Sequence, residues 1–270
     1  MRLDEAGELG LLAELERRGL VHGIEHDAAQ VGGLVVTQDA LVEGVHFRFD
    51  LLSRRELGFR AAAANLSDLA ASGAEPLALI VALGVPGSAR VEDVVELYEG
   101  LSEPGVPVRG GDTTLAAAVF LSVTAIGRAE RVPGRAGARP GDLVVLTGPL
   151  GAAGAAFRSG RLARPPLRLE EGRRLAQVAT AMIDVSDGLA TDAAHIARRS
   201  GCRVAIELER VPFAAGATVE DVGFGEDYEL LATTPDALGF SVIGRCEEGS
   251  GVELTLRGQS VELSGWEHFR

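Results

Sequence analysis

The chain has 270 residues, 46% of them hydrophobic, which is enough for two modest domains with cores of their own. Its formal net charge of −13 argues against general binding to nucleic acid or to anionic membranes. No apolar run approaches the roughly 18 residues that cross a bilayer, and the acidic N-terminus does not resemble a signal peptide. We therefore expect a cytoplasmic protein with neither a nucleic-acid nor a membrane partner.

The sequence contains no lysine, so all 26 basic residues are arginine. This excludes a Walker-A lysine, the strand lysine of protein kinases and Schiff-base chemistry. The two cysteines, Cys202 and Cys246, have neither the spacing of a metal site nor that of a disulfide framework. If the protein handles phosphate, arginine side chains, backbone N–H groups and metal ions must do it.

In the first half of the chain, helices and strands are predicted in irregular alternation. Ser53 and Glu56 form a capping box, which predicts that an Ala-rich helix begins there and runs to about Gly73. Further helices are expected over 4–18 and 91–101, and strands over 34–37, 77–85 and 119–127.

A segment rich in Gly, Arg and Pro, from Arg131 to Gly141, predicts a linker between two halves. Beyond it we expect helices over 151–159, 168–180 and 188–199, and strands over 143–147, 182–185, 204–208, 230–233 and 241–245. Because strands and helices do not alternate strictly, the fold class is predicted to be α+β, in two domains, 1–137 and 138–270.

Six aspartates share one context: each lies near the end of a predicted element, among small or polar residues that would let a phosphate or a hydrated metal approach. For each one alone, the commoner role is to cap a turn or a helix. Taken together, dispersed carboxylates suit several Mg²⁺ ions that bridge a polyphosphate. The six are Asp27, Asp39, Asp68, Asp112, Asp184 and Asp187.

Six motifs, in order along the chain, resemble those of the thiamine-monophosphate kinases, a family related to aminoimidazole ribonucleotide synthetase and selenophosphate synthetase. They are Thr37–Phe47 (TQDALVEGVHF), Ala64–Ala74 (ANLSDLAASGA), Gly110–Thr114 (GGDTT), Ala136–Asp142, Ile183–Leu189 (IDVSDGL) and Gly225–Leu231 (GEDYELL). One such motif would be weak evidence, whereas six in family order are specific.

The resemblance implies an N-terminal domain whose mixed sheet forms a barrel across a homodimer, followed by a C-terminal α+β domain. It also implies ATP-dependent phosphorylation of thiamine monophosphate to thiamine diphosphate by direct in-line transfer on several Mg²⁺ ions. The implied metal ligands are Asp27, Thr37, Asp39, Asp68, Asp112, Asp184 and Asp187, with Asp39, Asp68 and Asp112 serving the transfer itself. The implied ATP contacts are Gly111, Arg135, Ser186 and Tyr98, and the implied substrate contacts are His46, Glu226 and Trp266.

The sequence departs from the family pattern near three of the predicted metal ligands, and Thr114-Leu115 follows Asp112-Thr113 where the family often has an arginine. Glu25-His26 replaces the usual Gly-Asp before Asp27, and Gln38 replaces the usual Thr before Asp39. His26 either points toward the metal ions, which would favour Mn²⁺ over Mg²⁺, or faces solvent. Two alternatives to the kinase stay open: another ATP-using enzyme of the superfamily, and a nucleotide-binding protein without turnover.

Overall fold

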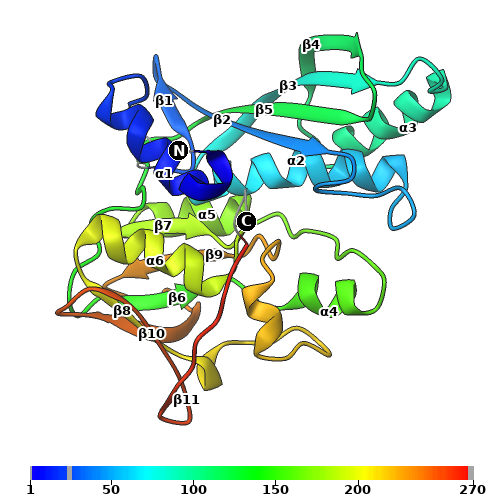
Figure 1. Cartoon of the computed structure of the whole chain (residues 1–270). Coiled ribbons are helices and arrows are strands. Elements are labelled where there is room, and N and C mark those ends of the chain that lie inside the picture. The colour runs from blue at the N-terminus through cyan, green and yellow to red at the C-terminus, as the bar shows by residue number, and fades with distance from the viewer. Residues whose placement is uncertain (1, 23–25, 267–270) are drawn as a thin grey trace.

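A computed structural model describes residues 2–22 and 26–266, and it contains two β-sheets, one in each half of the chain (Figure 1). No helix in these two described ranges is long and apolar enough to cross a membrane. The α+β class and the division into two domains are confirmed. The boundary between residues 137 and 138 stays our prediction.

The first sheet has the strand order β1-β2-β5-β3-β4, in which only the β3–β4 pair is parallel. Strand β2 is longer than predicted, and β4 was not predicted as a strand. The strands are β1 (Ala29–Val31), β2 (Leu34–Val42), β3 (Glu75–Val85), β4 (Val108–Leu115) and β5 (Phe120–Arg128), and the helices are α1 (Leu3–Arg17), α2 (Arg54–Ala71) and α3 (Val91–Ser102).

The second sheet has the order β12-β11-β8-β10-β6-β9-β7, with β11–β8 as its parallel pair. Its last two strands in the chain, β11 and β12, were not predicted. The strands are β6 (Leu143–Leu146), β7 (Ala181–Asp184), β8 (Arg203–Glu207), β9 (Leu230–Thr234), β10 (Ser241–Glu247), β11 (Gly251–Leu256) and β12 (Gln259–Ser260), and the α-helices are α4 (Ala152–Arg158), α5 (Leu169–Ala176) and α6 (Leu189–Ser200).

Helix α2 lies between the two halves and packs against both. It begins as the sequence predicts, because Ser53 accepts a hydrogen bond from the N–H of Glu56 while the Glu56 side chain accepts one from the N–H of Ser53. Fourteen of its 18 residues are buried, since its run of alanines allows close approach from the first sheet and from α5. A Cβ on Gly172 of α5 would lie 2.2 Å from the carbonyl oxygen of Ala70, so only glycine fits there.

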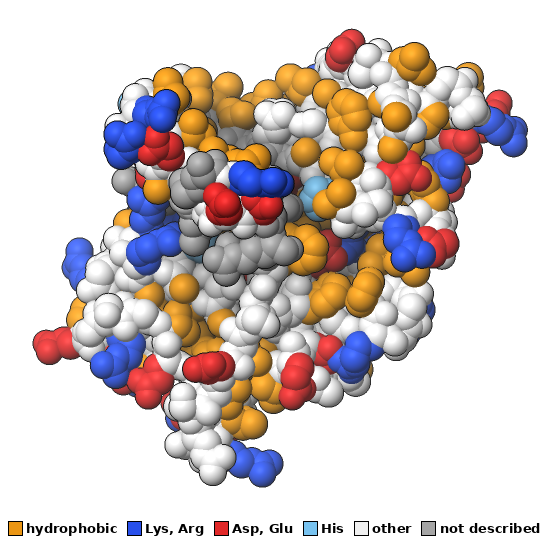
Figure 2. Space-filling view, in the orientation of Figure 1, with side chains coloured by type: hydrophobic (Ala, Val, Ile, Leu, Met, Phe, Trp, Pro, Cys, Tyr) orange, Lys and Arg blue, Asp and Glu red, His pale blue; other side chains and the backbone are white. Residues whose placement is uncertain are grey.

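Within residues 2–22 and 26–266, no helix covers the other face of the first sheet (Figure 1). On that face Ile80 of β3 is 39% exposed and Val42 of β2 is 36% exposed. Hydrophobic side chains gather along this part of the surface in the space-filling view (Figure 2). No closed barrel forms from the described part of a single chain, so the barrel across a homodimer stays a prediction.

Candidate metal and substrate site

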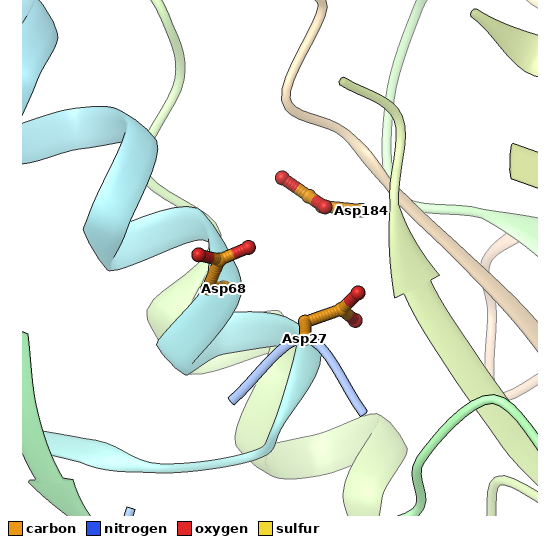
Figure 3. Close-up of side chains that lie close together, drawn as sticks. All are labelled: Asp27, Asp68 and Asp184. Carbon is orange, nitrogen blue, oxygen red and sulfur yellow. The ribbon is translucent and has the colours of Figure 1, made fainter. Parts of the chain in front are cut away.

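Three carboxylates from distant parts of the chain meet where the two halves join. Asp27 lies just before β1, Asp68 lies in the last turn of α2, and Asp184 ends β7. One oxygen of each lies within 4.8 Å of the others, and Figure 3 shows the three side chains around a common space. The sequence therefore identified three residues that the fold brings together.

Helix α2 positions this cluster through two neighbours of Asp68. The Asn65 side chain accepts a hydrogen bond from the N–H of Asp39 (3.1 Å) and donates to the carbonyl of Ala61 (2.9 Å). The Ser67 hydroxyl donates to Asp184 at 2.6 Å. One turn of the helix thus binds β2 of the first sheet and β7 of the second. Both residues stand in a motif that the sequence singled out, but neither was predicted to have a role of its own.

Asp39, Asp187 and Thr37 lie beside the three clustered carboxylates. The buried Thr37 hydroxyl donates to Asp68 and faces the carbonyl of Asp27, and Asp39 and Asp187 are close enough to repel each other. Contrary to the expectation that the aspartates lie at element ends, Asp39 lies in the middle of β2. Side chains alternate along a strand, so Thr37 and Asp39 both point toward α2.

Burial and mutual repulsion raise the pKa values of Asp39, Asp68 and Asp184. Burial, followed by Asp187 and Asp27, raises the pKa of Asp39 to about 6. Burial, followed by Asp27, raises the pKa of Asp184 to about 8, although the Ser67 hydroxyl opposes the rise. Burial and the charges of Asp39, Asp184 and Asp27 raise the pKa of Asp68 well above its ordinary value. A divalent cation bound among these carboxylates would balance their concentrated negative charge.

The residues fit Mg²⁺ by their chemistry, because every donor is a carboxylate or hydroxyl oxygen. His26 does not join them: no ring nitrogen of His26 belongs to the group of donors that lie within 4.8 Å of one another. Its ring packs against Gly134, where a Cβ would lie 2.1 Å from Nδ1, and it is half-buried. The ring of His26 therefore neither joins the carboxylate cluster nor faces solvent fully, which were the two positions expected from the sequence.

Arg135, for which the resemblance implies an ATP contact, forms an ion pair with Asp27 at 2.5 Å. Burial alone raises the pKa of Asp27, and the Arg135 guanidinium opposes that rise. The pair connects the segment between the two sheets to the carboxylate cluster. A role for Arg135 toward ATP stays a prediction.

A second group of predicted residues gathers around the turn after β7. Ser186 accepts a backbone hydrogen bond from Glu226 (2.8 Å), and the carbonyl of Asp187 accepts one from the N–H of Trp266 (2.9 Å). The Trp266 side chain is half-exposed. The turn therefore places the predicted ATP contact Ser186 and the predicted substrate contacts Glu226 and Trp266 beside the cluster. His46 lies in the turn after β2, where its Nδ1 accepts the N–H of Val42 (3.0 Å).

The three acidic side chains of the motif at 225–231 each bind a different neighbour. Asp227 accepts hydrogen bonds from the N–H groups of Gly151 (2.6 Å) and Ala153 (3.2 Å) at the start of α4. Glu229 accepts two bonds from Arg168, at 2.7 and 2.6 Å. Asp227 and Glu229 therefore hold the fold, and of the three acids only Glu226 reaches toward the first half of the chain.

Asp112, Gly111 and Tyr98 lie away from the cluster within one chain. Three strand spacings separate Gly111 from Asp39, which is about 14 Å, and Asp112 points to the opposite, uncovered face of the sheet. Gly111 has a structural reason to be glycine, because a Cβ would lie 1.8 Å from the carbonyl oxygen of Val81. Tyr98 lies on α3, which packs near the start of α2, about 15–20 Å along that helix from Asp68.

Gln38 shares the uncovered face of the first sheet, where its amide donates to Ser122 at 2.7 Å. It points away from Thr37 and Asp39 because it lies between them on the strand. The substitution of Gln for the usual Thr therefore leaves the three clustered carboxylates untouched in a single chain.

The two halves of the chain belong to the AIR synthase related proteins. The sequence matches the N-terminal domain of that family over residues 25–129 and its C-terminal domain over residues 139–256.

Thiamine-monophosphate kinases resemble the chain along nearly its whole length. The Aquifex aeolicus enzyme is 33% identical over all of both chains, and the Caulobacter vibrioides enzyme is 35% identical over 87% of this chain and 80% of its own. The solved structure of AaThiL complexed with AMPPCP and TMP superposes with a TM-score of 0.90 at 32% identity, over 99% of each chain. The chain belongs to the thiamine-monophosphate kinase family.

Proposed function

We propose that this protein transfers the γ-phosphoryl group of ATP to thiamine monophosphate and releases ADP and thiamine diphosphate. The observation that carries the proposal is the cluster of one buried and two half-buried carboxylates at the junction of the two halves, in a chain of this family. A relative of the same fold, 32% identical, has been solved with AMPPCP and TMP together, which supports the same pair of ligands here.

The reaction asks little covalent chemistry of the protein. A phosphate oxygen of thiamine monophosphate, already ionised near neutral pH, attacks the γ-phosphorus, and the bond to the bridging oxygen of ADP breaks. No strong general base is needed, so a chain without lysine can carry out the step. The residues that would hold Mg²⁺ are Asp27, Thr37, Asp39, Asp68, Asp184 and Asp187. Bound there, Mg²⁺ would neutralise charge on the β- and γ-phosphates.

The active form in this proposal is a homodimer. Asp112 faces the uncovered side of the first sheet, which also carries the exposed Ile80 and Val42, and it cannot reach Asp39 in its own chain. A second copy covering that face would bury these apolar side chains and would bring Asp112 of one copy toward the other. This arrangement would give Asp112, which lies at a distance from the cluster of its own chain, a place at the site.

The test is turnover by the purified full chain with ATP, Mg²⁺ and a panel of phosphorylated acceptors. We expect thiamine diphosphate and ADP in equal amounts, and a loss of about 100-fold or more for Asp39→Asn, Asp68→Asn and Asp112→Asn without loss of fold. Asp50→Asn, at an exposed carboxylate, is the control.

Each alternative has its own outcome in this assay. Turnover of a different acceptor identifies another enzyme of the superfamily, and ATP binding without product identifies a nucleotide-binding protein. Wild-type rates in all three Asn variants would refute the assignment of these carboxylates.

A further inference from the structure

Arg60, in the middle of α2, forms a buried ion pair between the two halves of the chain. Its Nη2 donates to Oε2 of Glu226 at 2.5 Å, and its Nη1 donates to the carbonyl of Ala163 at 2.8 Å. The Arg60 side chain is 5% exposed and that of Glu226 is 29% exposed. A single guanidinium from the first half therefore holds two separate segments of the second half.

The backbone at Glu226 is in a conformation that needs such support. Glu226 has φ 57° and Tyr228 has φ 51°, both in the left-handed region that residues with a Cβ seldom adopt. Such a conformation is costly and persists only where neighbouring groups fix it. The backbone bonds of Glu226 to Ser186 and of Tyr228 to Val185 hold the main chain, and Arg60 holds the side chain.

Stability alone does not explain why a charged residue occupies the buried position 60. Buried arginines are rare unless paired, and Nε of Arg60 has no hydrogen-bond partner among the described residues. Replacing a buried ion pair by apolar side chains is often neutral or stabilising, so stability gives no strong reason for a charge at this position. The guanidinium also borders a cavity of about 70 Å³, lined in part by Phe59, Leu162 and Pro165.

We propose that Arg60 is a positioning residue that fixes the Glu226 carboxylate for the phosphoryl acceptor. The inference rests on the proposed function and on the contact between Glu226 and thiamine monophosphate that the family resemblance implies. Because Arg60 holds Oε2, the direction in which Oε1 is presented is set by α2, the helix that also carries Asp68. A carboxylate aimed in this way binds the cationic, amine-bearing ring system of the acceptor and does not contact ATP.

The experiment compares Arg60→Met, Arg60→Lys, Glu226→Gln and the double variant Arg60→Met/Glu226→Gln. We expect Arg60→Met to raise KM for thiamine monophosphate about tenfold or more while KM for ATP stays within about twofold. Arg60→Lys keeps the charge but loses the fork that reaches both acceptors, so its KM should lie between those of wild type and Arg60→Met. Arg55→Met, on the same helix at an exposed pair with Glu99, is the matched control.

The double variant shows whether Arg60 acts through Glu226. If it does, adding Arg60→Met to Glu226→Gln raises KM for thiamine monophosphate no further. Additive effects would mean that Arg60 contacts the acceptor directly, and an unchanged KM in Arg60→Met would mean that it does not contribute. Either result overturns the inference. Thermal unfolding of each variant checks the fold, and Arg60→Lys carries the test if Arg60→Met does not fold.

Failure of the proposed function looks different from failure of this inference. Wild-type protein that neither binds thiamine monophosphate in calorimetry nor converts it overturns the proposed function and, with it, the assigned acceptor. Wild-type protein that is active and an Arg60→Met variant with wild-type KM overturn the positioning role alone.

Discussion

Removing one buried charge from the carboxylate cluster should stabilise the metal-free protein at alkaline pH. Asp184 is 3% exposed, and burial with the charge of Asp27 raises its pKa to about 8. In Asp184→Asn the side-chain oxygen can still accept the hydrogen bond from Ser67, so the substitution removes mainly the charge.

The direction follows from the protons bound in each state. Between about pH 4 and pH 8 the folded protein keeps a proton on Asp184 that the unfolded chain has lost, so the free energy of unfolding falls as pH rises through that range. A rise of the pKa from 3.8 to about 8, at about 1.4 kcal/mol for each tenfold change, sets a ceiling of about 6 kcal/mol on the effect. Asn at this position should therefore gain a few kcal/mol at pH 8 and almost nothing at pH 4.

Urea unfolding in EDTA at pH 5 and pH 8 measures this difference, with Asp50→Asn as the exposed control. We expect a higher midpoint for Asp184→Asn at pH 8, a much smaller gain at pH 5, and unchanged midpoints for the control. Adding Mg²⁺ at pH 8 should stabilise the wild type more than the variant, since the ion binds the ionised cluster. An Asp184→Asn protein that is less stable than wild type at pH 8 in EDTA would refute the electrostatic reasoning.

Three further predictions concern other parts of the chain. His26→Asp should leave the Mn²⁺/Mg²⁺ rate ratio unchanged, because the ring packs on Gly134; a ratio shifted toward Mg²⁺ would place His26 at the metal. Light scattering at micromolar concentration should give twice the chain mass of 28.1 kDa, and a monomer would contradict the dimer. Asp227→Asn should lower stability by about 1 kcal/mol through the weaker cap on α4, with KM for both substrates retained; a lost activity would contradict a purely structural role.

The sequence predicted most helices and strands because their local signals were strong. The capping box at Ser53 set the start of α2, and Gly201, in the left-handed conformation, ends α6 as predicted. Strand β4 was missed because Gly110 and Gly111 have low β-propensity, and pairing with β3 overrides that preference. Strands β11 and β12 were missed because their sequence is polar and turn-rich, and β11 is held by pairing with β8 and β12 by pairing with β11.

The carboxylate cluster could be predicted because its residues stand in motifs. The residues that hold the cluster in place, Asn65 and Ser67, could not be predicted. Asn65 and Ser67 act through long-range contacts with β2 and β7, and no local pattern shows which face of a buried helix meets which sheet. Arg60 did leave a signal that sequence reasoning passed over: a lone charged residue beside a run of alanines in a helix that must be buried requires a partner. The separation of Asp112 from Asp39 required the strand order, which the sequence does not contain.

Helix α2 also fixes the distance between the carboxylate cluster and the Glu226 carboxylate. Arg60 and Asp68 stand about 12 Å apart along its axis, and each reaches across to the second half of the chain, one to Glu226 and the other toward Asp184. An α-helix packed on both sides neither stretches nor shortens, so the span between the carboxylate cluster and the Glu226 carboxylate is fixed by the rise per residue. We expect this fixed distance to disfavour acceptors that are too short to reach from the Glu226 carboxylate to the carboxylate cluster.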